Sequence, residues 1–264
     1  MIVDLVLSPF DATATDLVEA ARAADDGGFG GVWTFDHLTG SMLGRRWSRH
    51  PFTALGAMAA ATSRVRLGPL VANMMNRHPV ELTQAMATLQ PLSGGRAVLG
   101  LGSGASPGSR FAAEHEAIGT GLLKGPDRRA RMAETIRLVD ALWRGEGTFR
   151  GTWFSVDGLG EVVGGERRPP LIVGANGPTM VDLALDLADG VNLNLGCDAT
   201  ALLARIAKAR PARFETSLLV EPDEHGRLDP APYRDQRNLD RLVVLVRDPS
   251  DLTALRRLSD DLIA

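Results

Sequence analysis

Short apolar runs of the β type alternate with longer helical patterns along the whole chain, and this alternation is what most constrains the fold. The runs predict eight strands, at residues 3–7, 32–35, 65–71, 97–101, 171–173, 191–195, 214–220 and 242–246. Strict alternation indicates parallel strands joined by right-handed crossovers. Because the 264 residues hold eight such units, we predict one α/β domain, a closed (β/α)₈ TIM barrel, for which roughly 250 residues is typical. A doubly wound open sheet is the alternative.

Helical spacing and helix-end signals place helices between these strands. The expected ranges are 16–26, from 51 to about 63, 79–92, 128–143, 180–188, 199–209 and 250–263. Thr15 is expected to cap the first helix, and the Gly27-Gly28 pair to end it. Residues 148–156 break the rhythm with an alternating pattern around Gly151, which predicts a small hairpin insertion. Residues 221–238 are rich in Pro, Asp and Arg and predict only a poor helix.

Charge and composition exclude several classes of function. The formal net charge of −3 supplies no basic field for nucleic acid or a membrane surface. No apolar run approaches the ~20 residues of a membrane helix, and the first residues read as a strand rather than a signal peptide. Cys197 is the single cysteine, so neither a disulfide framework nor a cysteine metal cluster is expected. We therefore expect a cytoplasmic protein with a small-molecule substrate and no metal.

The strand ends select the candidate site, since a barrel of this kind carries its active site at the carboxyl ends of its strands. Asp36 and His37 follow the second strand, and Asn73 begins the segment after the third. Gly102, Ser103 and Gly104 follow the fourth strand. Gly174, Ala175, Asn176 and Gly177 follow the fifth, and Cys197 follows the sixth.

Two glycine-rich segments are candidates for anion binding. Gly100 to Ala105 fits the relaxed dinucleotide pattern G-x-G-x-x-A, but Pro107 and Gly108 follow where that motif needs a helix at once. These glycines either turn the chain out of the barrel or present bare amides to an anion or an aromatic ring. Gly174 to Pro178 lies between a strand and a helix, and Pro178 suits a first helical turn. It is either a phosphate site at a helix N-terminus or an ordinary turn.

Three further side chains have a functional and a structural interpretation. His37 either packs structurally or lines the barrel mouth beside Asp36. His78 precedes Pro79 and is expected to be a cap or loop residue. Cys197 has no adjacent base to make it a thiolate, which favours pocket lining over a nucleophile. Motifs for zinc proteases, P-loops and serine nucleophiles are missing from the sequence.

Four stretches together resemble the luciferase-like superfamily, and within it the F420-dependent oxidoreductases. They are residues 33–37, residues 68–79, the segment running from 85–89 through 93–96 to 102–104, and residues 170–178, and Ala188-Asp189-Gly190 also fits. The second stretch is similar to the third-strand segment of methylenetetrahydromethanopterin reductase. The resemblance runs in order from residue 1 to about 195.

The resemblance implies a (β/α)₈ barrel with a flavin or deazaflavin across its mouth. It implies a non-prolyl cis peptide in a bulge of the third strand at Leu70–Val71, with Ala72 and Asn73 beside it. It implies that backbone at 102–104 and 174–177 holds the cofactor phosphate, and that Asp36 and His37 lie beside the ring as the catalytic pair. A homodimer is a family expectation.

The sequence also departs from the family. Only about twenty residues separate the last two predicted strands, where members usually carry a longer insertion, and Met74-Met75 replace a proline and an aromatic residue. The leading hypothesis is an F420-dependent oxidoreductase that passes a hydride between the deazaflavin C5 and a small organic substrate. The alternatives are an FMN-dependent monooxygenase and a non-catalytic cofactor-binding relative.

Overall fold

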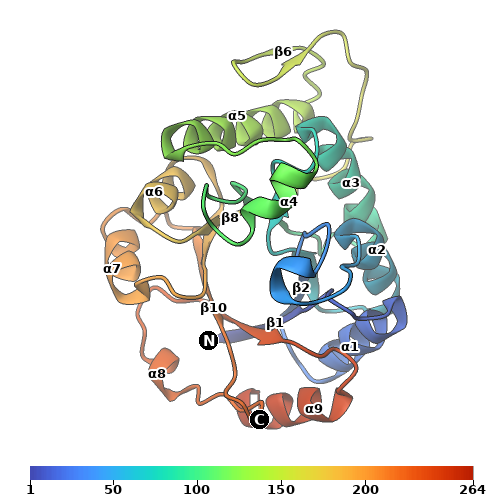
Figure 1. Cartoon of the computed structure of the whole chain (residues 1–264), viewed down its shortest axis with the longest axis vertical. Coiled ribbons are helices and arrows are strands. Elements are labelled where there is room, and N and C mark those ends of the chain that lie inside the picture. The colour runs from blue at the N-terminus through green and yellow to red at the C-terminus, as the bar shows by residue number, and fades with distance from the viewer. Residues whose placement is uncertain (264) are drawn as a thin grey trace.

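The computed structural model describes residues 1–263, and in them the strands form a closed parallel barrel (Figure 1). The strands are β1 (Ile2–Leu7), β2 (Gly31–Thr34), β3 (Arg66–Pro69), β4 (Ala72–Asn73), β5 (Leu99–Gly102), β8 (Leu171–Ala175), β9 (Gly190–Leu193), β10 (Glu215–Val220) and β11 (Arg241–Val246). Their order is β3-β2-β1-β11-β10-β9-β8-β5-β4, and β3 and β4 are two halves of the third barrel strand. The Val98 N–H donates to the Leu67 carbonyl at 2.9 Å, which closes the circle. The predicted barrel is confirmed, and the open sheet is wrong.

The helices form a ring outside the strands (Figure 1). The longer ones are α1 (Ala14–Asp26), α2 (Pro51–Ala61), α3 (Pro79–Leu92), α5 (Gly125–Trp143), α6 (Pro178–Leu187), α7 (Ala199–Ala209) and α9 (Leu252–Leu262). Three short ones are η1 (Ser41–Leu43), α4 (Ala112–Ala117) and α8 (Ala231–Arg234). The expected poor helix in 221–238 is the single turn of α8. Within residues 1–263 we find no helix with the length and apolar character needed to cross a membrane.

The cap of α1 differs from the expected one. Thr13, not Thr15, caps the helix: its hydroxyl accepts from the Asp16 N–H at 3.0 Å, and the Asp16 carboxylate accepts from the Thr13 N–H at 2.7 Å. This reciprocal box needs an acceptor side chain three residues after the cap. Asp16 supplies it for Thr13, whereas Val18 offers none for Thr15.

The predicted hairpin is present as β6 (Phe149–Arg150) and the antiparallel β7 (Ser155–Val156). It projects beyond α5 in Figure 1. The carboxylate of Glu134 on α5 accepts the backbone N–H groups of Thr152, Trp153 and Phe154 at 2.7–2.8 Å. The Glu134 carboxylate alone therefore connects three residues of the hairpin to α5.

The interior of the barrel is apolar in the middle and ionic at the amino ends of the strands. The central side chains include Val6, Val98, Ile172 and Val243. Below them, the buried Asp4 accepts from Trp33 Nε1 at 3.1 Å and from Arg241 at 2.8 Å, and Arg241 also binds Glu215. This network fills one end of the barrel, so that open space is left at the other end.

Candidate functional site

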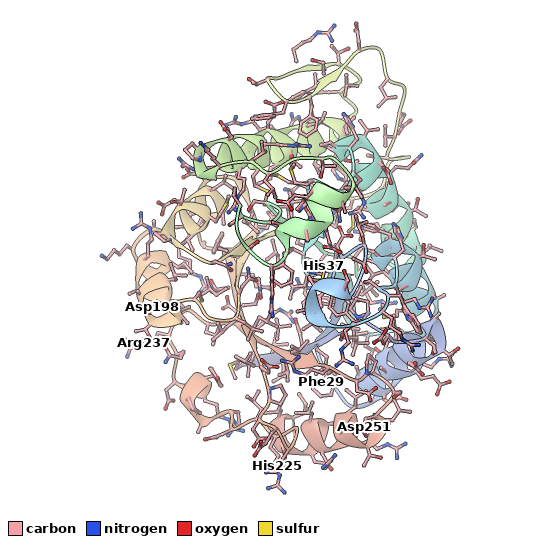
Figure 2. All side chains as sticks on the ribbon, viewed as in Figure 1. Phe29, His37, Asp198, His225, Arg237 and Asp251 are labelled. Carbon is pink, nitrogen blue, oxygen red and sulfur yellow. The ribbon has the colours of Figure 1, made fainter. Side chains whose placement is uncertain are left out.

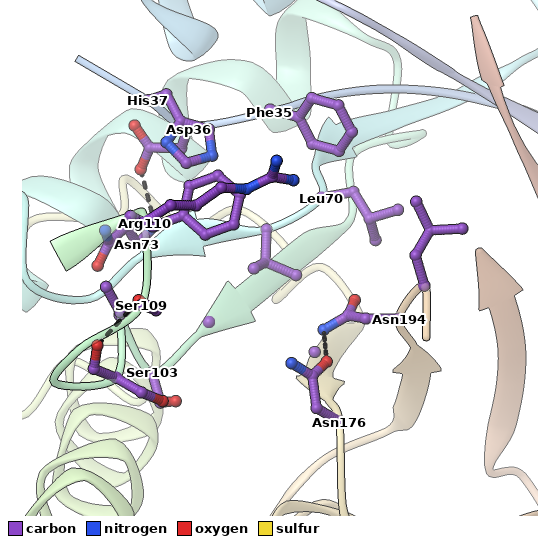
Figure 3. Close-up of a pocket in the computed structure, with 18 of the residues that line it drawn as sticks. Phe35, Asp36, His37, Leu70, Asn73, Ser103, Ser109, Arg110, Asn176 and Asn194 are labelled. Carbon is purple, nitrogen blue, oxygen red and sulfur yellow. Dashed lines mark hydrogen bonds between the residues drawn. The ribbon is translucent and has the colours of Figure 1, made fainter. Parts of the chain in front are cut away.

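A cavity of about 1230 Å³ opens at the carboxyl ends of the strands. It is lined by His37 and Asp36 after β2 and by most of the residues predicted to bind a cofactor (Figures 2 and 3). Those residues are Leu70, Val71, Asn73, Gly102, Ser103, Gly104, Gly174, Asn176 and Gly177. The strand-end rule thus brings four separate loops to one place.

Three predicted residues lie outside this lining. Ala72 and Ala175 are buried among the side chains packed between the sheet and the helices, because they alternate with the inward-facing Val71 and Gly174 along their strands. Their assignment as cofactor-binding residues stays a prediction, and only their backbone groups could make that contact. Cys197 packs against the same outer layer rather than lining the cavity, and burial raises the pKa of its thiol.

Val71 and two glycines form the floor of the cavity. The Leu70–Val71 peptide bond is cis, as the resemblance implies. A side chain at Gly102 would overlap the Val71 side chain, and one at Gly174 would approach it to 3.0 Å. The missing side chains therefore allow three barrel strands to meet closely below the cavity. At Gly177, by contrast, an added Cβ would meet no atom of residues 1–263 within 4 Å and would stand in the open cavity.

Asp36 is held by neighbours other than His37. It is 4% exposed. Its carboxylate accepts both guanidinium nitrogens of Arg77 and the backbone N–H of Asn73, the last at 2.7 Å. The pair fastens the segment after β4 to the end of β2. The predicted catalytic role of Asp36 stays a prediction, and its contacts are those of a residue that orders the loop.

The partner of His37 is Glu114, which α4 brings to the mouth of the barrel. The Nδ1 atom of His37 lies 2.6 Å from Glu114 Oε2, while Oε1 accepts the N–H groups of Leu38 and Thr39 at 2.7 and 2.9 Å. Burial raises the pKa of Glu114, but the His37 and backbone hydrogen bonds outweigh it and leave that pKa below its usual value. The carboxylate is therefore ionised at neutral pH.

His115, next to Glu114 on α4, connects this helix to the loops after β4 and β5. Its Nε2 atom lies 3.1 Å from the Asn73 amide nitrogen and accepts from the Ala105 N–H at 3.3 Å, and its Nδ1 lies 3.2 Å from the Thr120 hydroxyl. Burial lowers the pKa of His115, in keeping with a neutral ring that accepts at Nε2. The Asn73 carboxamide also accepts from the Met75 N–H at 3.0 Å. These contacts hold Asn73 in the loop after β4, and its assignment as a cofactor-binding residue stays a prediction.

The rest of the cavity lining is polar and cationic. Asn194 donates to Asn176 at 2.6 Å, and both side chains point into the space that Figure 3 draws. Four lining arginines have no carboxylate partner within residues 1–263: Arg45, Arg110, Arg128 and Arg129. Arg128 binds the Ser106 hydroxyl, and burial lowers its pKa. These cationic side chains suit an anionic ligand.

The sequence reasoning missed Glu114, His115, Arg128 and Asn194 as site residues. Helix α4 escaped prediction because it is six residues long and buries a glutamate and a histidine instead of an apolar stripe. No local pattern marks such a helix. His78 was predicted correctly as a cap: its Nδ1 accepts the Val80 N–H at the start of α3.

Known proteins match the chain in sequence. The family model for luciferase-like monooxygenases matches residues 5–218. The F420-dependent glucose-6-phosphate dehydrogenase of Microbacterium testaceum is 32% identical over 216 residues, which cover 78% of this chain and 62% of that protein. The 5,10-methylenetetrahydromethanopterin reductase of Archaeoglobus fulgidus is 31% identical over 262 residues, covering 92% of this chain and 70% of that protein.

Solved structures match the fold. An F420-dependent secondary alcohol dehydrogenase in complex with an F420-acetone adduct superposes with a TM-score of 0.74 at 21% identity, over 98% of this chain and 83% of that one. The coenzyme F420-dependent tetrahydromethanopterin reductase of Methanopyrus kandleri gives a TM-score of 0.74 at 18% identity, over 99% and 98% of the two chains. At these identities the likeness concerns the barrel alone.

Coverage of the sequence relatives is partial. The chain spans 62% of the Microbacterium dehydrogenase and 51% of the dehydrogenases of the same name from Beutenbergia cavernae and Nakamurella multipartita. The family match nevertheless extends over most of the chain, from β1 into β10. On that match, the chain belongs to the luciferase-like monooxygenase family.

Proposed function

We propose that this protein is an F420-dependent oxidoreductase that passes a hydride between the deazaflavin C5 and a small organic substrate. One observation carries the proposal: the His37 imidazole and the floor made by Val71, Gly102 and Gly174, where two side chains are missing, line the same cavity. A proton-transferring group thus lies beside a surface that fits a planar ring. The F420-dependent activities named for the sequence relatives support the choice of deazaflavin.

The residues present fit this cofactor at both ends. Leu70 and Val71 would back the ring. Gly177 is the N-cap residue of α6, and no side chain within residues 1–263 caps this helix, so its first N–H groups are available to the cofactor phosphate. Arg128, whose buried Nε has no hydrogen-bond partner in the described part of the chain, would neutralise part of the charge. When bound, the deazaflavin supplies the two-electron hydride chemistry.

His37 would move the proton that accompanies the hydride. Oxidation of an alcohol releases a hydride from carbon and a proton from oxygen, and the reverse reaction needs both returned. The Nε2 atom of His37 makes no hydrogen bond within residues 1–263 and its side chain is 21% exposed toward the cavity. Proton transfer by such a group contributes about 10²–10⁴-fold to a rate.

Titration of the purified protein with F420 and with FMN, followed by fluorescence, tests the cofactor. Tighter binding of F420 is expected, followed by turnover against a panel of small alcohols and carbonyl compounds. Preference for FMN, with oxygen-dependent turnover given a partner reductase, would replace this function with that of a monooxygenase. Tight F420 binding without turnover on any substrate would instead indicate a cofactor-binding relative.

We also infer a homodimer, on the family expectation. Light scattering behind size-exclusion chromatography, with and without F420, measures the mass in solution directly. A monomer at assay concentrations would remove this part of the proposal.

A further inference from the structure

The contact between His37 and Glu114 determines which ring nitrogen carries the proton. An ionised carboxylate only accepts hydrogen bonds. At 2.6 Å from Glu114 Oε2, the Nδ1 atom of His37 must therefore carry a hydrogen. Its Nε2 then presents a lone pair to the cavity whenever the ring is neutral.

Glu114 itself has no freedom to take another arrangement. Its side chain is 4% exposed, and its second oxygen is held by the Leu38 and Thr39 N–H groups, which directly follow His37 in the chain. The imidazole is confined as well, between the rings of Phe10 and Phe111 at centroid distances of 5.5 and 5.3 Å. Both the tautomer and the orientation of the ring are thus set before any ligand binds.

We propose that Glu114 is a positioning residue that holds His37 as the Nδ1–H tautomer, with the Nε2 lone pair aimed at the substrate. The carboxylate also stabilises the imidazolium that forms when Nε2 accepts the proton of a substrate hydroxyl. The consequence for turnover rests on the proposed function, whereas the tautomer of His37 does not.

The other charged and titratable groups around His37 do not form a hydrogen bond with its ring in residues 1–263, so the positioning role falls to Glu114. Asp36, the preceding residue, is paired with Arg77. His115 on α4 points to Asn73 and Ala105. Arg45 and Arg110 line the same cavity, and as cations they oppose a positive charge on the imidazole. Among these groups, the carboxylate of Glu114 is the one that contacts the ring.

Glu114→Gln is the sharpest variant, because a glutamine has almost the same shape. Its single oxygen is needed by the Leu38 and Thr39 N–H groups, so its amide N–H₂ faces His37 Nδ1. The imidazole must then accept at Nδ1 and carry its hydrogen on Nε2. Glu116→Gln is the matched control, because Glu116 is exposed on the same helix and this substitution removes the same charge.

NMR of nitrogen-labelled histidine in the free protein tests the tautomer without any cofactor. The His37 signals, assigned by their loss in His37→Asn, should report hydrogen on Nδ1 in the wild type and Glu116→Gln, and on Nε2 in Glu114→Gln. The same tautomer in all three proteins would overturn the proposal, whatever the protein catalyses.

Kinetics test the catalytic consequence in the holoenzyme. Glu114→Gln should lower kcat for alcohol oxidation about 10²-fold or more with F420 affinity unchanged. The acidic limb of its kcat/KM profile should move to lower pH, because the ring loses a stabilising negative charge. Glu114→Asp should restore much of the rate, and this recovery separates a positioning role from a folding defect.

A double variant shows whether Glu114 acts through His37. The combination His37→Asn with Glu114→Gln should turn over no more slowly than His37→Asn alone, since residues that work as one unit are not additive. Independent losses that multiply in the double variant would overturn the proposal. If the wild type binds F420 but oxidises no alcohol, the proposed function fails, and the NMR result still decides the role of Glu114.

Discussion

The carboxylate of Asp36 accepts both guanidinium nitrogens of Arg77, a residue 41 positions further along the chain. The side chains of Asp36 and Arg77 are 1% and 6% exposed. The pair joins the end of β2 to the loop that follows β4, and the same carboxylate binds the Asn73 N–H. Two of the loops that line the cavity are therefore fastened by one buried ion pair.

Breaking this pair should destabilise the fold. Asp36→Asn leaves Arg77 as an uncompensated buried charge, which costs about 3–5 kcal/mol in the free energy of unfolding. Denaturant unfolding measures the loss. Arg144→Met, which breaks the exposed Arg144–Glu146 pair, is the control and should have little effect. If Asp36→Asn instead keeps its stability and loses only turnover, Asp36 has the catalytic role predicted from the sequence.

A side chain at Gly177 should block the ligand without harming the fold. Its φ of −163° is open to any residue, and an added Cβ meets no atom of the described residues within 4 Å. Gly177→Val should therefore weaken F420 binding at least tenfold, which corresponds to about 1.4 kcal/mol, with an unchanged Tm. Gly160→Val is the matched control, since Gly160 is equally open but lies outside the cavity. Equal affinity of the two variants would move the phosphate site away from α6.

Removal of the His37 imidazole should separate proton transfer from packing. If His37 moves a proton, His37→Asn lowers turnover about 10²–10⁴-fold while F420 affinity stays nearly constant. If it only packs between Phe10 and Phe111, affinity and turnover should fall modestly together. Steady-state kinetics beside fluorescence titration distinguishes the two, and unaltered turnover would remove His37 from the mechanism.

Asp25 should make the free energy of unfolding depend on pH in the acidic range. Its carboxylate accepts the backbone N–H groups of Ser63, Arg64 and Val65 at 2.8–2.9 Å. Burial raises the pKa of Asp25, but these hydrogen bonds together lower it below its usual value. A depressed folded-state pKa means that the stabilisation is present at neutral pH and is lost as the pH falls below about 3.9 and through the folded pKa.

Asp25→Asn should therefore cost on the order of 1.5–3 kcal/mol at pH 7 and progressively less in acid. Urea unfolding at a series of pH values measures the difference. Asp26→Asn, at the exposed neighbouring position, should follow the wild type throughout. A penalty for Asp25→Asn that stays constant down to the acid transition would contradict the assignment.

Much of the barrel was predictable because its signals are local. The bounds of α3 and α7 match the predicted ranges, since Pro79 and the helical spacing mark them within the sequence itself. The strand-end rule then located His37, Gly102, Gly174 and Gly177 at one cavity, because eight parallel strands must place their carboxyl ends together.

Only the tertiary structure decided which side chains of the site form hydrogen bonds with one another. No local sequence pattern links His37 to Glu114, which is 77 residues away on a short helix with a polar buried face. Nor does any local pattern indicate that Asp36 pairs with Arg77 instead of with the adjacent His37. Hydrogen-bond partners depend on which side chains the closed barrel brings within 3 Å, and that distance is set by the packing of whole loops. The sequence by itself therefore determined the barrel and the strand ends at which the site lies. The tertiary structure decided which side chains form hydrogen bonds with His37 and Asp36.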